Sequence, residues 1–465
     1  MNLSQSIKKL YQKSPVFIQN ITISVYGLYW KRRRLGGVFS KQVKEFEIRE
    51  NYKLNQWKVY QTSVLRKLLI HAFDTVPYYR ELYSKHGFRR MDFQNFEIKD
   101  LKMLPYLEKD ELRKYGSTTL LSSKSQRGSF LSSSGSTGTP VKIFFSNETH
   151  QTWSAAYEAR VRNWAGLNYK MSRGMIGGRR ILPDANANAP YYRYNYAEKQ
   201  TYFSAYHLSL ETVSDYLEGM LKNKVEYMVG YAMSNYLLAE YMEIKGLQAP
   251  KLKAVLTSSE KLTSKMRDTM ERVYRCKVFD GYSGVEACGL ISENGNGEFL
   301  FSPDTGVMEV INEDGLAVSN GETGEVVATG FLNFDQPLIR YRIGDRVTIA
   351  EDQKTTLDVS MLKIKEIEGR IEDVVIAKDG RKMVRFHGLF IDIPKLMAAQ
   401  LIQNSIEDFT INLVVESGFL KVAESEIKRR LYGQVGEVSV DFKYLQDIPR
   451  NSNGKFRSVI SRVKT

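Results

Sequence analysis

SSSGSTGTPVK, residues 132–142, contains only Ser, Gly and Thr in its first eight positions, then closes on a proline and reaches Lys142. Apolar runs of strand length flank it, which favours a loop between two strands over an interdomain tether. Gly135 and Gly138 permit positive backbone angles, so successive amides can point into one concavity that suits a polyphosphate. No Gly-Lys-Ser/Thr opens a helix here, so the segment is not a Walker loop. An ordinary solvated loop is the alternative that this stretch alone leaves open.

The length and composition of the chain predict a globular protein with more than one domain. Its 465 residues are too many for one small core, and the 42% hydrophobic and 12% aromatic content is enough for large cores. Only Cys276 and Cys288 are present. Two cysteines cannot supply a four-ligand zinc site or a disulfide framework. We therefore expect a reduced, cytoplasmic location.

The net charge of +14 is concentrated at the N-terminus. Residues 1–50 hold ten Lys/Arg against three Glu, a net charge of +7, and the densest piece is YWKRRR (29–34). Three alternatives fit it: a solvated arm that packs its aromatic residues on the main domain, a segment that binds an anionic membrane surface, or one that binds nucleic acid. The preceding apolar run is too short to span a bilayer, because Gln19, Asn20 and Ser24 interrupt it. No small-residue cleavage site of a secretory signal follows, and no motif predicts a nucleic-acid partner.

The periodicity of apolar residues predicts an α/β fold. Residues 41–75 have few helix breakers and apolar positions three and four apart, which predicts a helix. From about residue 150 to 290 helices and strands alternate, with KAVLTSS (253–259) as a buried strand. This alternation favours a mostly parallel sheet.

Beyond residue 300 the pattern changes to hairpins and then to a small mixed region. MEVINEDGLAV and VVIAKDGRKMVRF each place Asp-Gly between apolar runs, which predicts two-residue turns. We place a domain boundary near residue 369. It divides the chain into residues 1–368, which include a basic helical arm over 1–75, and residues 369–465.

Two further segments carry groups that fit a polyphosphate ligand. PLIRYRIGD (337–345) predicts a strand that ends in Gly-Asp, and Asp345 at such an end can accept both hydrogen bonds of a ribose diol. IPRNSNGKFR (448–457) holds Lys455 in a polar turn, from which a mobile end-domain could deliver its charge to a phosphate. For either segment alone, a turn-closing Asp and a solvated surface Lys are the alternatives.

These segments, in this order, resemble the adenylate-forming superfamily of acyl- and aryl-CoA ligases. The resemblance covers most of the chain and is closest to the capsule and polysaccharide-biosynthesis branch of the phenylacetate–CoA ligase family. It implies a large N-terminal domain of mixed parallel sheets with a small β-barrel-like subdomain, and a small, mobile α+β C-terminal domain. The motifs that carry it are SSSGSTGTP for the phosphate loop, TSSEKL (257–262) and DGYSGVEA (280–287) for the adenine pocket, PLIRYRIGD for the ribose-binding strand, EGRIED (368–373) for the hinge and PRNSNGKFR for the catalytic-lysine loop.

The resemblance also implies the ligands and the residues that bind them. ATP and Mg2+ would be cofactors, a small carboxylic acid the substrate, and CoA one acceptor. Lys455 would be catalytic, bridging the carboxylate and the α-phosphate, and Glu286 would be catalytic as the metal ligand. Asp345 would bind the ribose with support from Arg370. The other ATP-binding residues would be Ser134, Gly135, Ser136, Thr137, Gly138, Thr139, Ser258, Ser259, Glu260, Gly281, Tyr282 and Ser283.

The chain departs from the family pattern at several positions. Ser283 and Val285 stand where many members have Gly and Thr, and the hinge residue Glu372 stands where Asp or Lys is more common. After the hinge, VVIAKDGRKMVRFHG has no clear counterpart of the Arg-Gly turn that admits the pantetheine arm of CoA. The acceptor therefore stays open between CoA and an amine.

By the same resemblance, the acyl pocket is expected in GGRRILP (177–183) and SAYHLS (204–209). Its candidate residues are Arg179, Arg180, His207 and Tyr231. The arginines and the histidine suit a polar or anionic acid, such as a sugar acid. Surface arginines and a hydrogen-bonded structural histidine are the alternative.

The functional hypothesis is activation of a carboxylic acid as acyl-AMP with pyrophosphate release, then acyl transfer to CoA, in capsule or O-antigen polysaccharide biosynthesis. One alternative is an amide synthetase that transfers the acyl group to an amine without CoA. An alternative of another class is a noncatalytic scaffold of a polysaccharide-synthesis complex. The expected location is the cytoplasm, with peripheral contact to the inner face of the membrane through the basic N-terminus as one alternative.

Overall fold

The structure is a computed structural model. It describes residues 11, 14–132, 141–178, 181–182, 187–355, 360–368, 374–383, 386, 389–390, 393–448 and 457–463.

A twelve-stranded sheet forms the centre of the fold, with the order β11-β12-β13-β14-β10-β9-β8-β7-β6-β3-β5-β4. Strands β5, β3, β6, β7 and β8 are parallel neighbours, which confirms the predicted parallel sheet, and the other pairings are antiparallel. The strands are β3 (Arg173–Gly177), β4 (Tyr192–Asn195), β5 (Gln200–Ser204), β6 (Tyr227–Tyr231), β7 (Ala254–Ser258), β8 (Lys277–Ser283), β9 (Leu290–Glu293), β10 (Phe299–Phe301), β11 (Gly306–Ile311), β12 (Thr323–Gly330), β13 (Tyr341–Ile349) and β14 (Leu362–Glu368).

Helices cover both faces of the parallel strands, so these strands are apolar on both sides. On β7, Val255 belongs to a core cluster with α8 (Val213–Lys222), α9 (Ala232–Ile244) and α10 (Ser264–Tyr274). Its neighbour Leu256 points to the opposite cluster, which includes side chains of α3 and of α7 (Asn147–Tyr157). The π-helix η3 (Glu158–Arg162) and the short η4 (Asn163–Ala165) continue α7.

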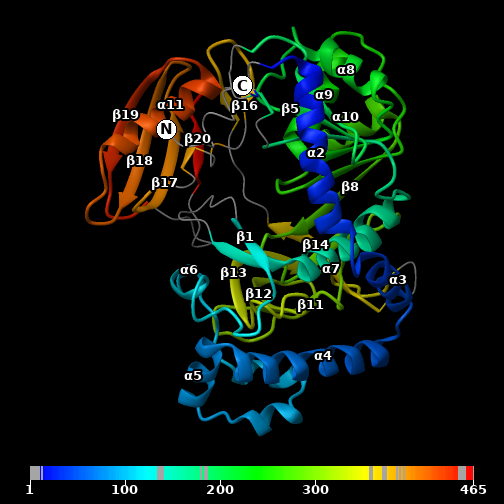
Figure 1. The fold of residues 1–465 in the computed structure, drawn as a ribbon, viewed down its shortest axis with the longest axis vertical. Coiled ribbons are helices and arrows are strands. Elements are labelled where there is room, and N and C mark those ends of the chain that lie inside the picture. The colour runs from blue at the N-terminus through cyan, green and yellow to red at the C-terminus, as the bar shows by residue number, and fades with distance from the viewer. Residues whose placement is uncertain are drawn as a thin grey trace.

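The N-terminal part is helical, and most of it packs against the antiparallel half of the sheet (Figure 1). The helix expected over 41–75 is two helices, because the chain turns at residues 51–53 and the Gln56 side chain then caps the second helix by accepting from the Lys53 N–H. The elements are α2 (Val16–Leu35), α3 (Phe39–Glu50), α4 (Leu54–Thr75), α5 (Pro77–Lys85), η1 (Arg90–Gln94), η2 (Ile98–Met103) and α6 (Lys109–Tyr115).

One alternative expected the basic arm to pack its aromatic residues on the main domain, but only some of them do so. Trp30 of α2 contacts the His150 ring edge to face at 5.7 Å, but Tyr26 and Tyr29 are exposed. The side of α2 that meets the protein also carries polar side chains: Asn20 and Ser24 accept the backbone N–H groups of Tyr194 and Tyr196.

The loop that opened the sequence analysis is carried by a hairpin, as predicted. Strands β1 (Gly128–Ser132) and β2 (Lys142–Ser146) pair antiparallel, with Ser132 opposite Lys142. Residues 133–140 lie outside the described residues.

After β14 a separate α+β unit follows, drawn in orange and red in Figure 1. Its four-stranded sheet has the order β19-β18-β17-β20 and packs with α11 (Val422–Val435) around its own apolar core. The boundary near residue 369 stays a prediction, because residues 369–373 are not described. The strands are β15 (Val375–Ile376), β16 (Lys382–Met383), β17 (Leu396–Gln403), β18 (Asp408–Val415), β19 (Ser439–Tyr444) and β20 (Val459–Ser461).

The prediction of two-residue Asp-Gly turns was wrong in detail. In the β15–β16 hairpin, Gly380 N–H donates to the Ala377 carbonyl and Ala377 N–H to the Arg381 carbonyl. Only Gly380, with φ +81°, has a positive backbone angle. The turn is therefore the three-residue kind with a glycine bulge, and Gly315 makes the same arrangement after β11.

Candidate active site

Residues from several predicted motifs meet at one edge of the sheet. Across the parallel strands, Gly177 of β3 pairs with Ser204 of β5, and Tyr231 of β6 pairs with Ser258 of β7, which pairs with Gly281 of β8. This is the carboxyl edge of the strands, where open α/β sheets bind their ligands. The sequence predicted the segments that contain these residues, and the strand register shows that the residues lie side by side across neighbouring strands.

The backbone is unusual at three residues of the predicted nucleotide-binding motifs. Ser259, Ala287 and Arg340 have φ angles of +73°, +50° and +49°. Residues with side chains seldom adopt such angles, and they concentrate at functional sites. All three lie within or beside the predicted nucleotide-binding motifs.

Tyr282 and Asp345 are brought together from two distant motifs. The Tyr282 hydroxyl donates to Asp345 Oδ2 at 2.7 Å, from β8 to β13. Burial of the hydroxyl and the negative charge of Asp345 raise the pKa of Tyr282 well above its ordinary value. The hydroxyl therefore stays protonated and remains a hydrogen-bond donor, while both residues keep part of their surface exposed.

Glu286 lies close to this pair and is buried. Together with burial, its charge raises the pKa of Tyr282, Cys288 and Tyr341. A Cβ at Gly284 would come within 2.3 Å of Glu286 Oε2, so glycine leaves room for the carboxylate there.

A single buried carboxylate fits Mg2+, which commonly binds one or two protein carboxylates and takes its other ligands from phosphates and water. In the described part of the chain, no group of three or more His, Cys, Asp or Glu side chains could hold a metal ion. The Glu286 carboxylate could share a metal ion with a bound polyphosphate.

The TSSEKL segment is fixed to the start of α9. Glu260 Oε2 accepts the Met233 N–H at 2.9 Å, and Ser258 Oγ lies 3.5 Å from Ser259 Oγ. Glu260, predicted as an ATP-binding residue, thus holds its loop against α9. Ser283, at the end of β8, is exposed.

Asp280 is a residue of this edge that the sequence analysis did not single out. Its Oδ1 accepts hydrogen bonds from Thr257 Oγ1 and Gly281 N–H, both at 3.0 Å. Burial nevertheless raises the pKa of Asp280 to about 7, against the lowering effect of these bonds. The only signal in the sequence was its place directly before Gly281 in DGYSG.

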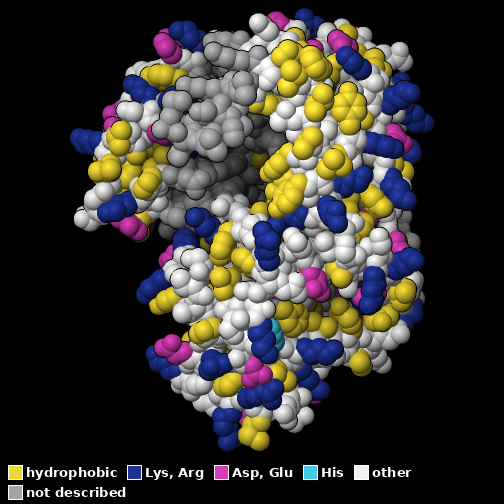
Figure 2. All heavy atoms as spheres, viewed as in Figure 1, with side chains coloured by type: hydrophobic (Ala, Val, Ile, Leu, Met, Phe, Trp, Pro, Cys, Tyr) yellow, Lys and Arg dark blue, Asp and Glu magenta, His cyan; other side chains and the backbone are white. Residues whose placement is uncertain are grey.

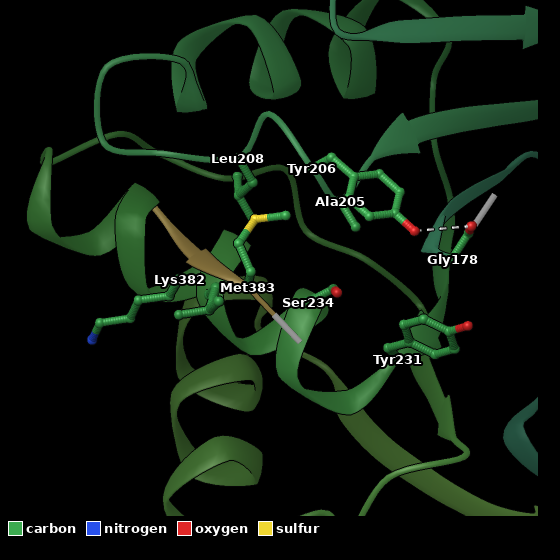
Figure 3. A pocket seen from close by; sticks show the side chains of 9 residues that line it. Gly178, Ala205, Tyr206, Leu208, Tyr231, Ser234, Lys382 and Met383 are labelled. Carbon is green, nitrogen blue, oxygen red and sulfur yellow. Dashed lines mark hydrogen bonds between the residues drawn. The ribbon is translucent and has the colours of Figure 1, made fainter. Parts of the chain in front are cut away.

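A small, partly open pocket lies next to the sheet edge (Figure 3). Tyr231, a candidate acyl-pocket residue, is among its lining residues, and the Tyr206 hydroxyl donates to the Gly178 carbonyl at 3.3 Å. Hydroxyl groups and aliphatic side chains are mixed in its wall. The lining residues are Gly178, Ala205, Tyr206, Leu208, Tyr231, Ser234, Leu237, Lys382 and Met383.

His207 lies beside this pocket and is not among its lining residues. Its Nδ1 is 2.7 Å from Ser204 Oγ, and its ring stacks on Tyr191 at 5.1 Å between centroids. These contacts hold the buried ring in place and favour the hydrogen-bonded structural alternative, while a pocket role for His207 stays a prediction.

Two pocket residues come from the C-terminal unit, and no pattern in the sequence predicted them. Lys382 and Met383 belong to β16, in the hairpin that follows the hinge. Beside them, the Arg381 guanidinium donates to the Tyr206 carbonyl and to Asp379 Oδ2. Arg381 thus links the β15–β16 hairpin to the loop that contains Tyr206.

The hairpin that carries the glycine-rich loop is tied to the segment that leads into β13. Phe144 N–H donates to Gln336 Oε1 at 2.6 Å, and Asn333 Nδ2 donates to the Phe144 carbonyl at 2.9 Å. The base of the loop is thus anchored near the start of PLIRYRIGD. Several predicted residues lie outside the described residues: Ser134, Gly135, Ser136, Thr137, Gly138, Thr139, Arg179, Arg180, Arg370, Glu372 and Lys455.

Comparison with known proteins agrees with this arrangement. Residues 375–462 match the family model of the CapK C-terminal domain. The chain is 26% identical to Protein CapK of Staphylococcus aureus, over 98% of this chain and 99% of that protein. It is 24% identical to the phenylacetate-coenzyme A ligase of Escherichia coli (strain K12), over 71% of this chain and 74% of the ligase.

Solved structures of 2-hydroxyisobutyryl-CoA ligase share the fold. One, in the postadenylation state with R3-HIB-AMP, has a TM-score of 0.56 at 17% identity, and the alignment covers 89% of this chain and 91% of the ligase. Another, with 2-HIB-AMP and CoA in the thioesterification state, has the same TM-score and coverage at 18% identity. The chain is therefore homologous to Protein CapK and to phenylacetate-coenzyme A ligases, carries a CapK C-terminal domain, and shares the fold of a CoA ligase.

Proposed function

We propose that this protein activates a small carboxylic acid as acyl-AMP, using ATP and Mg2+, and then transfers the acyl group to CoA. The observation that carries the proposal is the meeting of Tyr282, Glu286 and Asp345 at the carboxyl edge of the sheet, beside a pocket lined by Tyr231. In this arrangement Asp345 would be the ribose-binding carboxylate, Glu286 the metal-binding carboxylate, and the pocket the place of the small acid. Homology to coenzyme A ligases supports the same assignment.

The first step makes a poor electrophile reactive. A carboxylate oxygen bonds to the α-phosphorus of ATP, the bond from that phosphorus to the bridging oxygen breaks, and pyrophosphate leaves with the electron pair. Two anions must approach each other, so charge neutralisation and in-line positioning are the main needs. Lys455 would bridge the carboxylate and the α-phosphate, and the loop 134–139 would hold the departing pyrophosphate.

Asp345 and Glu286 are the described residues that would contact the nucleotide and its metal. Asp345, oriented by the Tyr282 hydroxyl, would accept the ribose hydroxyl groups with support from Arg370. Glu286 would hold Mg2+, which when bound neutralises charge on the phosphates. In the second step the sulfur of CoA bonds to the acyl carbon, its proton is lost, and AMP leaves.

The pocket suits a small acid that carries hydroxyl groups. Its wall offers the hydroxyl groups of Tyr206, Tyr231 and Ser234 among apolar side chains. Hydroxyl groups set among aliphatic side chains are the kind of polar group that orients a small hydroxylated ligand in a pocket. A sugar acid meets this description, and a role in capsule or other polysaccharide biosynthesis is proposed with it, on the homology to Protein CapK.

Two alternatives have distinct predictions. An amide synthetase would form product from an amine without CoA, and the missing Arg-Gly turn after the hinge favours it. A noncatalytic scaffold would release no pyrophosphate with any acid. We also propose a cytoplasmic location, on the two unpaired cysteines, to be tested by cell fractionation.

The test is pyrophosphate release from ATP and Mg2+ across aryl, fatty, amino and uronic acids, with and without CoA. Lys455→Ala is expected to lower the rate by about 10²–10³ while ATP binding by calorimetry is retained. Lys443→Ala, an exposed lysine of the same unit, is the matched control. ATP binding without pyrophosphate release from any acid would overturn the catalytic proposal in favour of the scaffold.

A further inference from the structure

Helix α2 faces the protein with its polar side. Asn20 Oδ1 accepts the Tyr194 N–H and Ser24 Oγ accepts the Tyr196 N–H, both at 2.9 Å. These residues belong to β4 or directly follow it, and β4 is an edge strand of the large sheet. The polar side chains thus satisfy backbone groups that an edge strand leaves open.

The opposite side of α2 is apolar and exposed. Its exposed apolar side chains recur three or four residues apart, so they form one stripe along the helix. Phe17 and Val25 each have 63% of their surface exposed to solvent. We call this stripe the α2 apolar ridge: Phe17, Ile18, Ile21, Val25, Leu28 and Tyr29.

Figure 2 shows hydrophobic side chains gathered over α2 with Lys and Arg beside them. The exposed Tyr196, whose N–H is held by Ser24, extends the apolar surface. Large contiguous apolar surfaces on soluble proteins mark interaction sites. The α2 apolar ridge therefore has the features of a docking surface, and the charge beside it indicates the kind of partner.

The charged residues of α2 are all basic, and the first 44 residues contain nine Lys/Arg and no Asp or Glu. Arg32 is exposed on the ridge side of the helix, whereas Lys31 donates to the Ala197 carbonyl beyond β4. Arg33 and Arg34 point the other way and fasten the helix, through His150 Nδ1 and Glu198.

We propose that the α2 apolar ridge docks α2 in the plane of an anionic lipid surface. Apolar and aromatic side chains on one face with basic residues beside them are the features of helices that lie in a membrane interface. No helix in the described ranges is long and apolar enough to cross a membrane, so the contact is peripheral. A second copy fits less well, because ridge-to-ridge contact would bring two N-terminal segments of +7 together.

The experiment is co-sedimentation of the full chain with vesicles of phosphatidylcholine alone or mixed with phosphatidylglycerol. The wild type is expected to bind the anionic vesicles, and less so at high salt. Ile21→Asp with Val25→Asp should lower the bound fraction about tenfold or more, because it places carboxylates on the ridge. Leu316→Asp with Leu420→Asp, at equally exposed leucines of other elements, should leave binding unchanged.

Three outcomes would overturn this inference. The wild type could fail to sediment with anionic vesicles, or the ridge variant could bind as well as the wild type. Light scattering could also show a dimer that the ridge variant converts to a monomer, which would make the ridge a self-association surface. Pyrophosphate release by the ridge variant reports on the catalytic proposal separately, because the ridge contains no proposed site residue.

Discussion

Replacing Tyr282 by phenylalanine keeps the partly exposed ring and removes only the hydroxyl that donates to Asp345 Oδ2 at 2.7 Å. The two residues are 63 positions apart in the chain, so this bond joins β8 to β13. The substitution therefore tests whether the predicted adenine and ribose motifs act as one site.

The expected size of the effect follows from the kind of bond. A hydrogen bond to a charged group contributes about 1.5–3 kcal/mol net, which corresponds to roughly 10- to 150-fold in an equilibrium constant. Tyr282→Phe should lower the free energy of unfolding by about this amount. Because Asp345 would lose the group that orients it, ATP affinity should fall by about tenfold as well.

The assays are urea unfolding and ATP calorimetry on the same protein samples. Tyr341→Phe is the matched control, since the Tyr341 hydroxyl is buried and has no hydrogen-bond partner among the described residues. Its loss should leave the free energy of unfolding unchanged or raise it, because no hydrogen bond is broken and a buried hydroxyl without a partner is costly. A double-mutant cycle with Asp345→Asn isolates the pairwise contribution.

A coupling of zero between positions 282 and 345, with equal stability of the two Tyr→Phe variants, would refute the reasoning. Lowered stability with unchanged ATP affinity would keep the hydrogen bond and reject its role in nucleotide binding. The two results separate structure from function.

Three further predictions concern the same edge of the sheet. Because the pKa of Asp280 is raised from 3.8 to about 7, the folded state keeps a proton that the unfolded state loses between these pH values. The free energy of unfolding should therefore fall as the pH rises from 4 to 7. Thermal unfolding across pH should show Asp280→Asn more stable than the wild type by about 1–3 kcal/mol above pH 7, but not at pH 4. Arg381→Ala removes the bond to the Tyr206 carbonyl, so hydrogen exchange of that pocket loop should rise severalfold, and unchanged exchange would show that the arginine does not hold the hairpin. Gly284→Ala places a Cβ 2.3 Å from Glu286 Oε2, which should displace the carboxylate. The rate of pyrophosphate release should then fall about 10- to 100-fold with little loss of stability. A normal rate of release would argue against the role of Glu286.

Much of the fold follows from local patterns in the sequence. The apolar run KAVLTSS predicted a buried strand, and β7 is buried on both faces because helices cover both. The hairpin around the glycine-rich loop was predicted from the two apolar runs beside it, and β1 and β2 pair as expected. Such features are local, since they depend on periodicity and turn residues within one segment.

The site could be predicted only in part. Motif resemblance named Tyr282, Glu286 and Asp345, but it gave no reason for Tyr282 to donate to Asp345. Asp280 was missed because its raised pKa comes from burial beside Glu293, a residue of the next strand. His207 was a candidate for the acyl pocket with a structural role as the alternative, because sequence alone does not show that its ring contacts Ser204 and Tyr191.

The sequence by itself therefore determined the order of the motifs, the parallel strands and the loop that joins β1 to β2. Tertiary structure decided which residues meet: Tyr282 with Asp345, and Met383 of the C-terminal unit with Tyr231 in one pocket. It also decided that α2 turns its polar side to the protein and its apolar ridge to solvent. The physical reason is that strand register and packing fix contacts between residues far apart in the chain, whereas periodicity records only that a segment has an apolar side.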